Sequence, residues 1–358
     1  RDVDGKAARK IPGVAAVFTA EDLAGVCSPW RALHALFPDA RVPAEGPLAA
    51  TRVRYVGEPV AIVLAETDAA AADGAEAVDV HIDPIAPVLD PDAAAAEGAP
   101  RLHDEAPDNL HAKLGRKLGE APAGGEAIPL TLHLTRIAVQ SMETRGLLAV
   151  WDGAEGTLTV HQSHQMQDIY ARLLGIDEHK VRVVTPDVGG AFGMKQQLHP
   201  DEMAAVCAAR ILGRPVRLLI DRNESLIVDA QARDHRLTAT AHVDQAERRV
   251  TGLTLRDRCG LGAFPHYPRT SFGESAQALR LAGAPYAFSH TDAEARLYFQ
   301  NRPHLGHYRG VGHPIAVLAT EALMDKAARR IGEDPITFRR KHLHDLTDGP
   351  VTTLSGIE

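Results

Sequence analysis

The chain has 358 residues, of which 45% are hydrophobic, and a formal net charge of −8 at pH 7. This length allows two domains with separate cores, and the mixed charges form no basic stripe of the kind that binds nucleic acid. No apolar run approaches the roughly 20 residues that span a bilayer, so we expect a cytoplasmic protein without nucleic-acid or membrane partners.

The three cysteines, Cys27, Cys207 and Cys259, lie far apart in the sequence. An iron–sulfur cluster needs about four clustered ligands, and a structural zinc site needs closely spaced Cys or His residues. Neither pattern occurs. We therefore expect reduced, partly buried thiols and no metal ligand among the side chains.

Residues 1–84 are predicted to form a first α+β unit. Residues 14–19 favour a short strand, and the apolar run at 60–65 is typical of a strand buried on both faces. Thr67 is placed to cap an alanine-rich helix, and residues 78–82 alternate as another strand.

Residues 85–127 are rich in Pro, Ala, Asp, Glu and Gly, a composition typical of a linker. We place the domain boundary there, so that residues 128–358 form the second unit. Its first strand is predicted from Leu130, Leu132 and Leu134, which alternate with polar residues on a half-buried strand.

The second unit continues with strands and helices in alternation. Ser163 is a plausible N-cap of a helix that Gly175 ends, and Pro200 opens an alanine-rich helix that stops before Gly213. Further strands are predicted at residues 157–160 and 181–184 and, after the helix, at residues 216–220. Residues 236–243 and 250–258 are predicted to form a long antiparallel pair. This mixture predicts an α+β domain with βαβ units.

The strand that starts at Val181 is expected to be buried, and it leads into a glycine-rich segment, GGAFGMK, at residues 189–195 (the first loop). Glycine permits close approach and unusual φ and ψ, so such a loop can offer backbone N–H groups to an oxygen-rich or anionic ligand. The alternative is a tight turn that packs Phe192 into a core. The glycine spacing matches neither a dinucleotide-binding loop nor a Walker A loop.

A second glycine-rich segment, HYRGVGH, occupies residues 307–313 (the second loop). Pro314 then opens a helix with apolar residues at helical spacing. One alternative is a helix entry without a ligand. If the two loops meet in space, however, they would bind one polar ligand between them.

These motifs, in this order, resemble those of the molybdenum hydroxylases, the family of xanthine dehydrogenase, aldehyde oxidoreductase and aerobic carbon monoxide dehydrogenase. The first loop resembles the family's GGGFGGK motif, with departures at Ala191 and Met194. Further resemblances are VGEPV at residues 56–60, METRG at 142–146 (with Thr144 in place of Pro) and YRGVG at 308–312. The resemblance implies an α+β fold, in which an α/β hammerhead domain (residues 1–84) precedes the first molybdopterin-binding domain (128–358).

The resemblance also implies a molybdopterin cofactor with molybdenum, in its cytosine dinucleotide form. Its expected ligands are Gly190, Ala191, Phe192, Gly193 and Arg309. Gln165 occupies the place of a glutamine that contacts the molybdenum centre in relatives, and Gln196 and Val311 are the expected specificity residues. Glu143 and Arg145 either form a surface pair or touch the cofactor region.

The implied activity is oxidation of an aldehyde or an aromatic heterocycle with water-derived oxygen, by a molybdenum-dependent oxidoreductase. In the family, the base is a glutamate near the C-terminus of the full-length large subunit, beyond Glu358. We therefore expect no catalytic residue here and no activity of this chain alone. The implied partners are an iron–sulfur subunit, an FAD subunit and the C-terminal half of the large subunit, in a dimer of heterotrimers.

Two departures from the sequences of relatives weaken the case for a purine or carbon monoxide as the substrate. Purine-oxidising relatives have a glutamate where this chain has Gln196, and the best-known carbon monoxide oxidisers have Cys where it has Gly310. A different hypothesis is a non-catalytic or split-subunit scaffold that binds cofactor only with a partner chain. Ala191 and Met194 favour it, because they add bulk where glycine lets a ligand approach.

Overall fold

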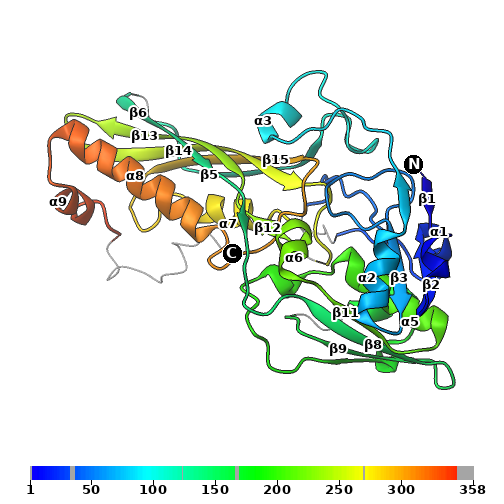
Figure 1. Ribbon diagram of the computed structural model, residues 1–358. Coiled ribbons are helices and arrows are strands. Elements are labelled where there is room, and N and C mark those ends of the chain that lie inside the picture. The colour runs from blue at the N-terminus through cyan, green and yellow to red at the C-terminus, as the bar shows by residue number, and fades with distance from the viewer. Residues whose placement is uncertain (1, 33–36, 123, 166–168, 269–270, 345–358) are drawn as a thin grey trace.

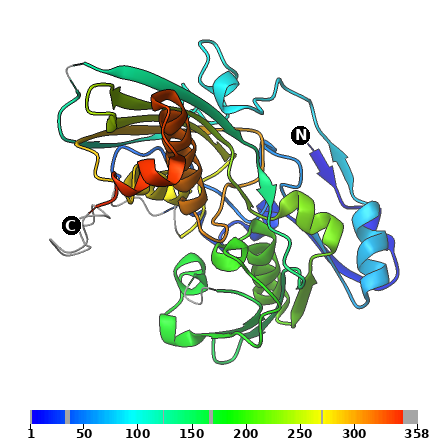
Figure 2. The same cartoon turned by 90° about the vertical axis from the view of Figure 1, so that its left-hand side faces the viewer.

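The computed structural model describes residues 2–32, 37–122, 124–165, 169–268 and 271–344. The linker residue Ala123 and the C-terminal part of the predicted second unit, from residue 345, lie outside this set. Figures 1 and 2 show a long twisted sheet with helix α8 along one face, a smaller sheet beside helix α5, and the N-terminal elements next to that smaller sheet.

The N-terminal elements form two small antiparallel sheets, β1 with β4 and β2 with β3. Their bounds are β1 Asp2–Asp4, a 3-10 turn Ala8–Lys10, β2 Val14–Thr19, α1 Ala20–Leu23, β3 Ala61–Ala65, α2 Asp68–Glu76 and β4 Asp79–His81. The predicted cap is confirmed, because Thr67 Oγ1 accepts a hydrogen bond of 3.2 Å from Ala70 N.

Two expectations for this unit are wrong. Strand β3 is not buried on both faces, since only Leu64 is buried and β2 is its one strand partner among the described residues. The unit also does not have a core of its own. Leu23 and Leu64 belong to the same buried cluster as Ala205 and Val206 of α5, so the N-terminal elements share the core of the smaller sheet.

The long sheet has five strands in the order β5-β15-β14-β13-β6. Their bounds are β5 Leu110–Leu118, β6 Glu126–Leu134, β13 His235–Asp244, β14 Arg249–Gly262 and β15 His290–Phe299. β13 and β14 form the predicted antiparallel pair. β14 and β15 are parallel and are connected through α7 (Gly273–Leu281), a βαβ unit whose helix and second strand the sequence analysis did not predict.

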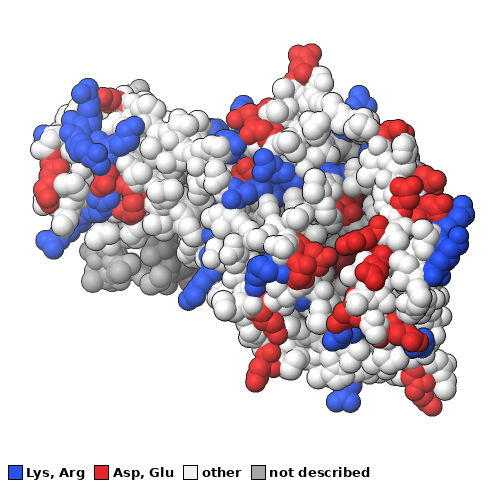
Figure 3. Space-filling model, viewed as in Figure 1, with Lys and Arg blue, Asp and Glu red and all other residues white. Residues whose placement is uncertain are grey.

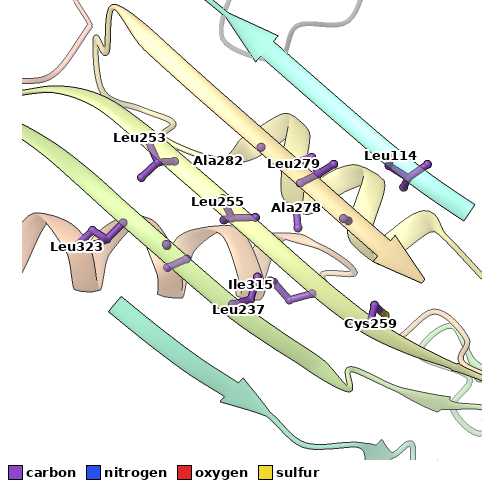
Figure 4. Close-up of a cluster of buried hydrophobic side chains, with 14 of the residues drawn as sticks. Leu114, Leu237, Leu253, Leu255, Cys259, Ala278, Leu279, Ala282, Ile315 and Leu323 are labelled. Carbon is purple, nitrogen blue, oxygen red and sulfur yellow. The ribbon is translucent and has the colours of Figure 1, made fainter. Parts of the chain in front are cut away.

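Helices α7 and α8 (His313–Ile331) cover one face of this sheet, and α9 (Pro335–Arg340) follows α8. Figure 4 shows the resulting core, in which Ile315 and Leu323 of α8 lie against Leu237 of β13 and Leu255 of β14. The predicted apolar face of α8 is confirmed, because Ile315, Ala319, Leu323, Ala327 and Ile331 are all buried.

The linker prediction does not hold for residues 110–118. These residues form β5, which pairs with β15 at the edge of the long sheet, and α3 (Pro91–Ala94) lies in the same stretch of chain. The composition of residues 85–127 as a whole concealed a local alternation. Ala112 and Leu114 are buried, whereas Lys113 between them is exposed.

The smaller sheet has four strands in the order β10-β9-β8-β11. The elements around it are β8 Gly146–Asp152, β9 Thr157–Gln162, α4 Tyr170–Leu174, β10 Val181–Val184, α5 Pro200–Leu212, β11 Val216–Leu219 and α6 Arg222–Val228. The remaining short elements are β7 Ile137–Ala138, β12 Gln231–Ala232 and the 3-10 turns Glu178–Lys180 and Met194–Gln196. β9, α4 and parallel β10 form the second βαβ unit.

Three sequence expectations for this region can be checked directly. Helix α5 has the predicted bounds, and Gly213 ends it with a φ of +60°. Strand β10 is half-buried rather than buried, because it is an edge strand. Ser163 does not cap α4, whose N-cap is Ile169. Its hydroxyl lies instead in the site described below.

All three cysteines are free and buried, as expected for reduced thiols. Within the described ranges, no helix combines the length and apolar character needed to cross a membrane. Positive and negative side chains are interspersed over the face of the molecule in Figure 3. This agrees with the absence of a basic stripe in the sequence.

Candidate functional site

The two glycine-rich loops meet in space, as predicted. The backbone N–H of Arg309 in the second loop donates a hydrogen bond of 2.9 Å to the carbonyl of Phe192 in the first. Gly193 is required at this contact. A Cβ atom there would lie 2.5 Å from the carbonyl oxygen of His307, and the residue has a φ of +105°.

The first loop presents unpaired backbone donors. In the part of the chain that the structure describes, the N–H groups of Gly190, Ala191 and Phe192 donate to no protein acceptor. The ring of Phe192 is 43% exposed, and its φ is +53°. Phe192 therefore does not pack into a core, and the tight-turn alternative is wrong. Successive free amides at a turn can bind an anionic or oxygen-rich group.

Gln165 lies directly against the first loop. Its side-chain Oε1 accepts a hydrogen bond of 3.1 Å from Gly193 N, and its own backbone N–H donates to the carbonyl of Lys195 at 2.9 Å. The residue is exposed. The structure thus brings Gln165 next to the predicted glycine-loop ligands, although it lies far from them in the sequence.

A buried lysine, Lys195, anchors the first loop to Glu143 and Ser163. Lys195 Nζ lies 2.8 Å from Glu143 Oε2 and 2.9 Å from Ser163 Oγ, and Glu143 Oε2 also accepts from Gly189 N at 2.8 Å. Partial burial acts to raise the pKa of Glu143, but the hydrogen bonds from Lys195, Ser163 and Gly189 outweigh it and lower that pKa. Glu143 is therefore a stable anion that holds the loop backbone.

Glu143 and Arg145 do not form the expected surface pair. Arg145 is fully buried and contacts Asp201 and Glu202 of α5 and Asp229 beyond α6. Burial raises the pKa of Glu202, although Arg145 acts in the opposite direction. The acids at the start of α5 therefore neutralise a buried guanidinium.

The second loop exposes a cation beside the first. The side chain of Arg309 is exposed, and no described residue accepts a hydrogen bond from its guanidinium. The backbone is unusual here, with φ values of +87° at Gly310 and +48° at Val311. The N–H of Gly312 donates to Gln277 Oε1 of α7 at 2.7 Å, which ties the loop to that helix.

The remaining predicted residues also lie at the junction of the loops. Gln196 is half-buried in the 3-10 turn after the first loop, and Val311 is half-buried in the second. Met194 is completely buried and Ala191 nearly so. Their side chains are therefore turned away from the exposed face of the loop, which removes the bulk argument for a scaffold.

Two groups that hold the loops were not predicted from the sequence. One is Ser163 with Lys195 and Glu143. The other is Arg233, which pairs with Glu274 and donates hydrogen bonds to the carbonyls of Arg309 and Val311. Lys195 carried a signal, because a lysine directly after a glycine loop is either a ligand or an anchor. Arg233 carried none, since its partner Glu274 lies 41 residues away and belongs to a different element. Among the described residues, no group of His, Cys, Asp or Glu is arranged to hold a metal ion.

Two protein-family models match the chain. The model described as the aldehyde oxidase and xanthine dehydrogenase a/b hammerhead domain matches residues 1–85, and the model of the molybdopterin cofactor-binding domain matches residues 102–343. The nicotine 6-hydroxylase large subunit of Paenarthrobacter nicotinovorans is 32% identical over 99% of this chain and 44% of its own length. The carbon monoxide dehydrogenase large chain of Hydrogenophaga pseudoflava is 28% identical, over 98% and 46%.

Solved structures agree. Quinoline 2-oxidoreductase from Pseudomonas putida 86 superposes with a TM-score of 0.90 at 30% identity, over 98% of this chain and 45% of that one. Aldehyde oxidoreductase from Desulfovibrio gigas gives a TM-score of 0.87 at 22% identity, over 98% and 39%, which shows a shared fold. The expected α+β fold class is confirmed. The chain spans about half the length of the curated relatives it matches.

Proposed function

Because this chain belongs to the molybdenum hydroxylase family as a molybdopterin-binding chain, we propose that the junction of its two loops holds one side of the cofactor. One observation carries this assignment. Three successive amides without a protein acceptor among the described residues, at Gly190, Ala191 and Phe192, lie in the loop that the backbone of Arg309 contacts, and the side chain of Arg309 is exposed. Together they form a polar, cationic surface without a protein acceptor in the described chain.

The chemistry of this donor set fits molybdopterin. The cofactor is anionic and rich in oxygen and sulfur, so backbone N–H groups and a guanidinium are suitable partners. Gly190, Ala191 and Phe192 would donate through their amides, Gly193 permits the close contact between the loops, and Arg309 would balance negative charge. Gln165 would complete the site from the side of β9, where Gly193 N already fixes its Oε1.

We assign the whole enzyme to the oxidation of an aldehyde or an aromatic heterocycle with water-derived oxygen. When bound, the molybdenum centre supplies the acceptor for two electrons. This chain would orient the cofactor and shape the entrance to it. Phe192 offers an exposed aromatic edge, while Gln196 and Val311 lie where they would contact a substrate and so select it. The general base belongs outside this chain, so the chain alone should be inactive.

The partners follow from the same assignment. We propose that this chain works with the C-terminal half of a large subunit, with an iron–sulfur subunit and with an FAD subunit, as a dimer of heterotrimers in the cytoplasm. The cofactor would be the cytosine dinucleotide form. A relative that is 30% identical is subunit gamma of a dehydrogenase complex, which supports a multi-subunit assembly. We propose that residues 1–84 form the hammerhead domain.

The test is the cofactor content of an Arg309→Gln variant, purified as the full-length protein with its partner subunits. A charge-assisted hydrogen bond contributes about 1.5 to 3 kcal/mol, so we expect roughly 10- to 100-fold weaker retention of molybdenum and pterin. Arg329→Gln is the matched control, because the side chain of Arg329 is 71% exposed and, among the described residues, forms an ion pair with Asp325 alone, at 3.5 Å. Equal cofactor content in both variants would contradict the assignment of Arg309.

A further inference from the structure

A single buried guanidinium holds the backbone of the second loop. Arg233 Nη1 donates to the carbonyl of Val311 at 2.8 Å, and Nη2 donates to the carbonyl of Arg309 at 3.3 Å. The same guanidinium lies over the ring of Tyr308, 5.7 Å from its centroid. Arg233 therefore contacts three residues of the loop that carries Arg309, although it is itself shielded from solvent.

The backbone that Arg233 holds is strained. Val311 has a φ of +48°, a conformation that a β-branched residue rarely adopts. Arg233 and Asp234 also have positive φ values, +71° and +88°, in two consecutive non-glycine residues. Strained residues of this kind persist only where surrounding contacts fix them, and they cluster at functional sites.

Buried charges in turn fix Arg233. Glu274 accepts from the backbone N–H of Arg233 at 2.8 Å and pairs with its guanidinium. His235 lies 3.5 Å from Glu274 and 2.8 Å from Asp257. All four side chains are at most 5% exposed. Burial acts to lower the pKa of His235, but Asp257 and Cys259 outweigh it and raise that pKa, which favours the charged imidazole beside the two carboxylates.

We propose that Arg233 is a positioning residue for the cofactor site. It fixes the carbonyls of Arg309 and Val311, and so holds the backbone from which the Arg309 guanidinium and the Val311 side chain extend. Glu274, supported by His235 and Asp257, holds Arg233 in place. This inference rests on the proposed function, because Arg233 can position the cofactor site only if the second loop contacts the cofactor. A merely structural ion pair would stabilise the fold without controlling the loop.

The test compares wild type with Arg233→Lys in the full-length protein with its partner subunits. Lysine keeps the charge beside Glu274, but its single ammonium group cannot reproduce the planar fork that reaches two carbonyls. The readout is amide hydrogen exchange in residues 307–313, where the N–H groups of Arg309, Val311, Gly312 and His313 are hydrogen-bonded. We expect exchange there to become at least about tenfold faster.

Arg145→Lys is the control, because Arg145 is equally buried among carboxylates but does not touch the second loop. It should leave exchange in residues 307–313 unchanged. Arg233→Gln is a second variant that also removes the charge, and if it fails to fold, Arg233→Lys still decides the question. Unchanged exchange in a folded Arg233→Lys protein would overturn the proposal.

Molybdenum and pterin content, measured on the same samples, separates this inference from the proposed function. Faster exchange with reduced cofactor content supports both. Faster exchange with full cofactor content would show only that Arg233 holds the backbone of the second loop, and it would contradict both its positioning role for the cofactor site and the assignment of that loop as a cofactor ligand.

Discussion

The two loops of the site are held by anchors of different design. Under the first loop, one buried lysine pairs with Glu143, whose side chain is 41% exposed. Behind the second loop, Arg233 and Glu274 are both buried, with side-chain exposures of 5% and 1%. If Lys195 is lost, water can solvate the half-exposed Glu143, whereas both Arg233 and Glu274 are shielded from water. The first loop therefore has an anchor that tolerates change, whereas the second is fixed by groups that depend on one another.

The largest loss of unfolding free energy is expected for Glu274→Gln. The change removes the anion that faces both Arg233 and His235, and it leaves two buried cations opposite Asp257 alone. Breaking a buried ion pair in this way costs about 3 to 5 kcal/mol of unfolding free energy. Denaturant titration measures that loss.

The control for this prediction is Glu105→Gln, because Glu105 pairs with Arg31 at 3.0 Å with half of each side chain exposed. Its expected loss is at most about 1 kcal/mol. Equal losses of unfolding free energy in the two variants would show that the buried anchor behind the second loop stabilises the fold no more than an exposed ion pair does.

Lys195→Met should have a smaller effect. It deprives Glu143 of its cation, but the carboxylate keeps its hydrogen bonds from Gly189 N and Ser163 and can take up water. We expect a loss of about 1 to 3 kcal/mol, together with faster amide exchange in residues 189–195. Lys113→Met, at a lysine that is 55% exposed and lies 3.0 Å from Glu294, is the matched control. A loss as large as that of Glu274→Gln would remove the contrast between the two anchors.

The smallest effect concerns pH. The folded-state pKa of Glu143 is lowered, so its contribution to stability is fully present above the unfolded value of about 4.3 and is lost as the pH falls through the folded value. The difference in unfolding free energy between wild type and Glu143→Gln should therefore shrink below about pH 4. A difference that stays constant from pH 7 into this acid range would show that the charge of Glu143 does not support the loop.

Much of the fold could be predicted because its signals are local. Pro200 and Gly213 mark the ends of α5, and Thr67 caps α2, since each acts on the backbone next to it. The prediction failed where distant partners decide. Residues 110–118 become a strand because β15 offers an edge, and Ser163 leaves its expected capping role because Lys195 and Glu143 are closer partners.

The candidate site divides in the same way. Gly190, Phe192, Gly193 and Arg309 were found because glycine spacing and the family motif lie in continuous sequence. Arg233 and Glu274 come together only when the segment between β12 and β13 meets α7. The positive φ values of Arg233 and Asp234 leave no trace in residue types, since neither residue is a glycine. Residue patterns therefore predicted the surface that we propose for the ligand, and only the structure identified what holds it.

The central claim is that the first and second loops together bind molybdopterin. The most direct measurement is an experimental structure of the cofactor-loaded, full-length protein. We expect cofactor density within hydrogen-bonding distance of the amides of Gly190, Ala191 and Phe192, and of the guanidinium of Arg309. Density that contacts neither loop would contradict it.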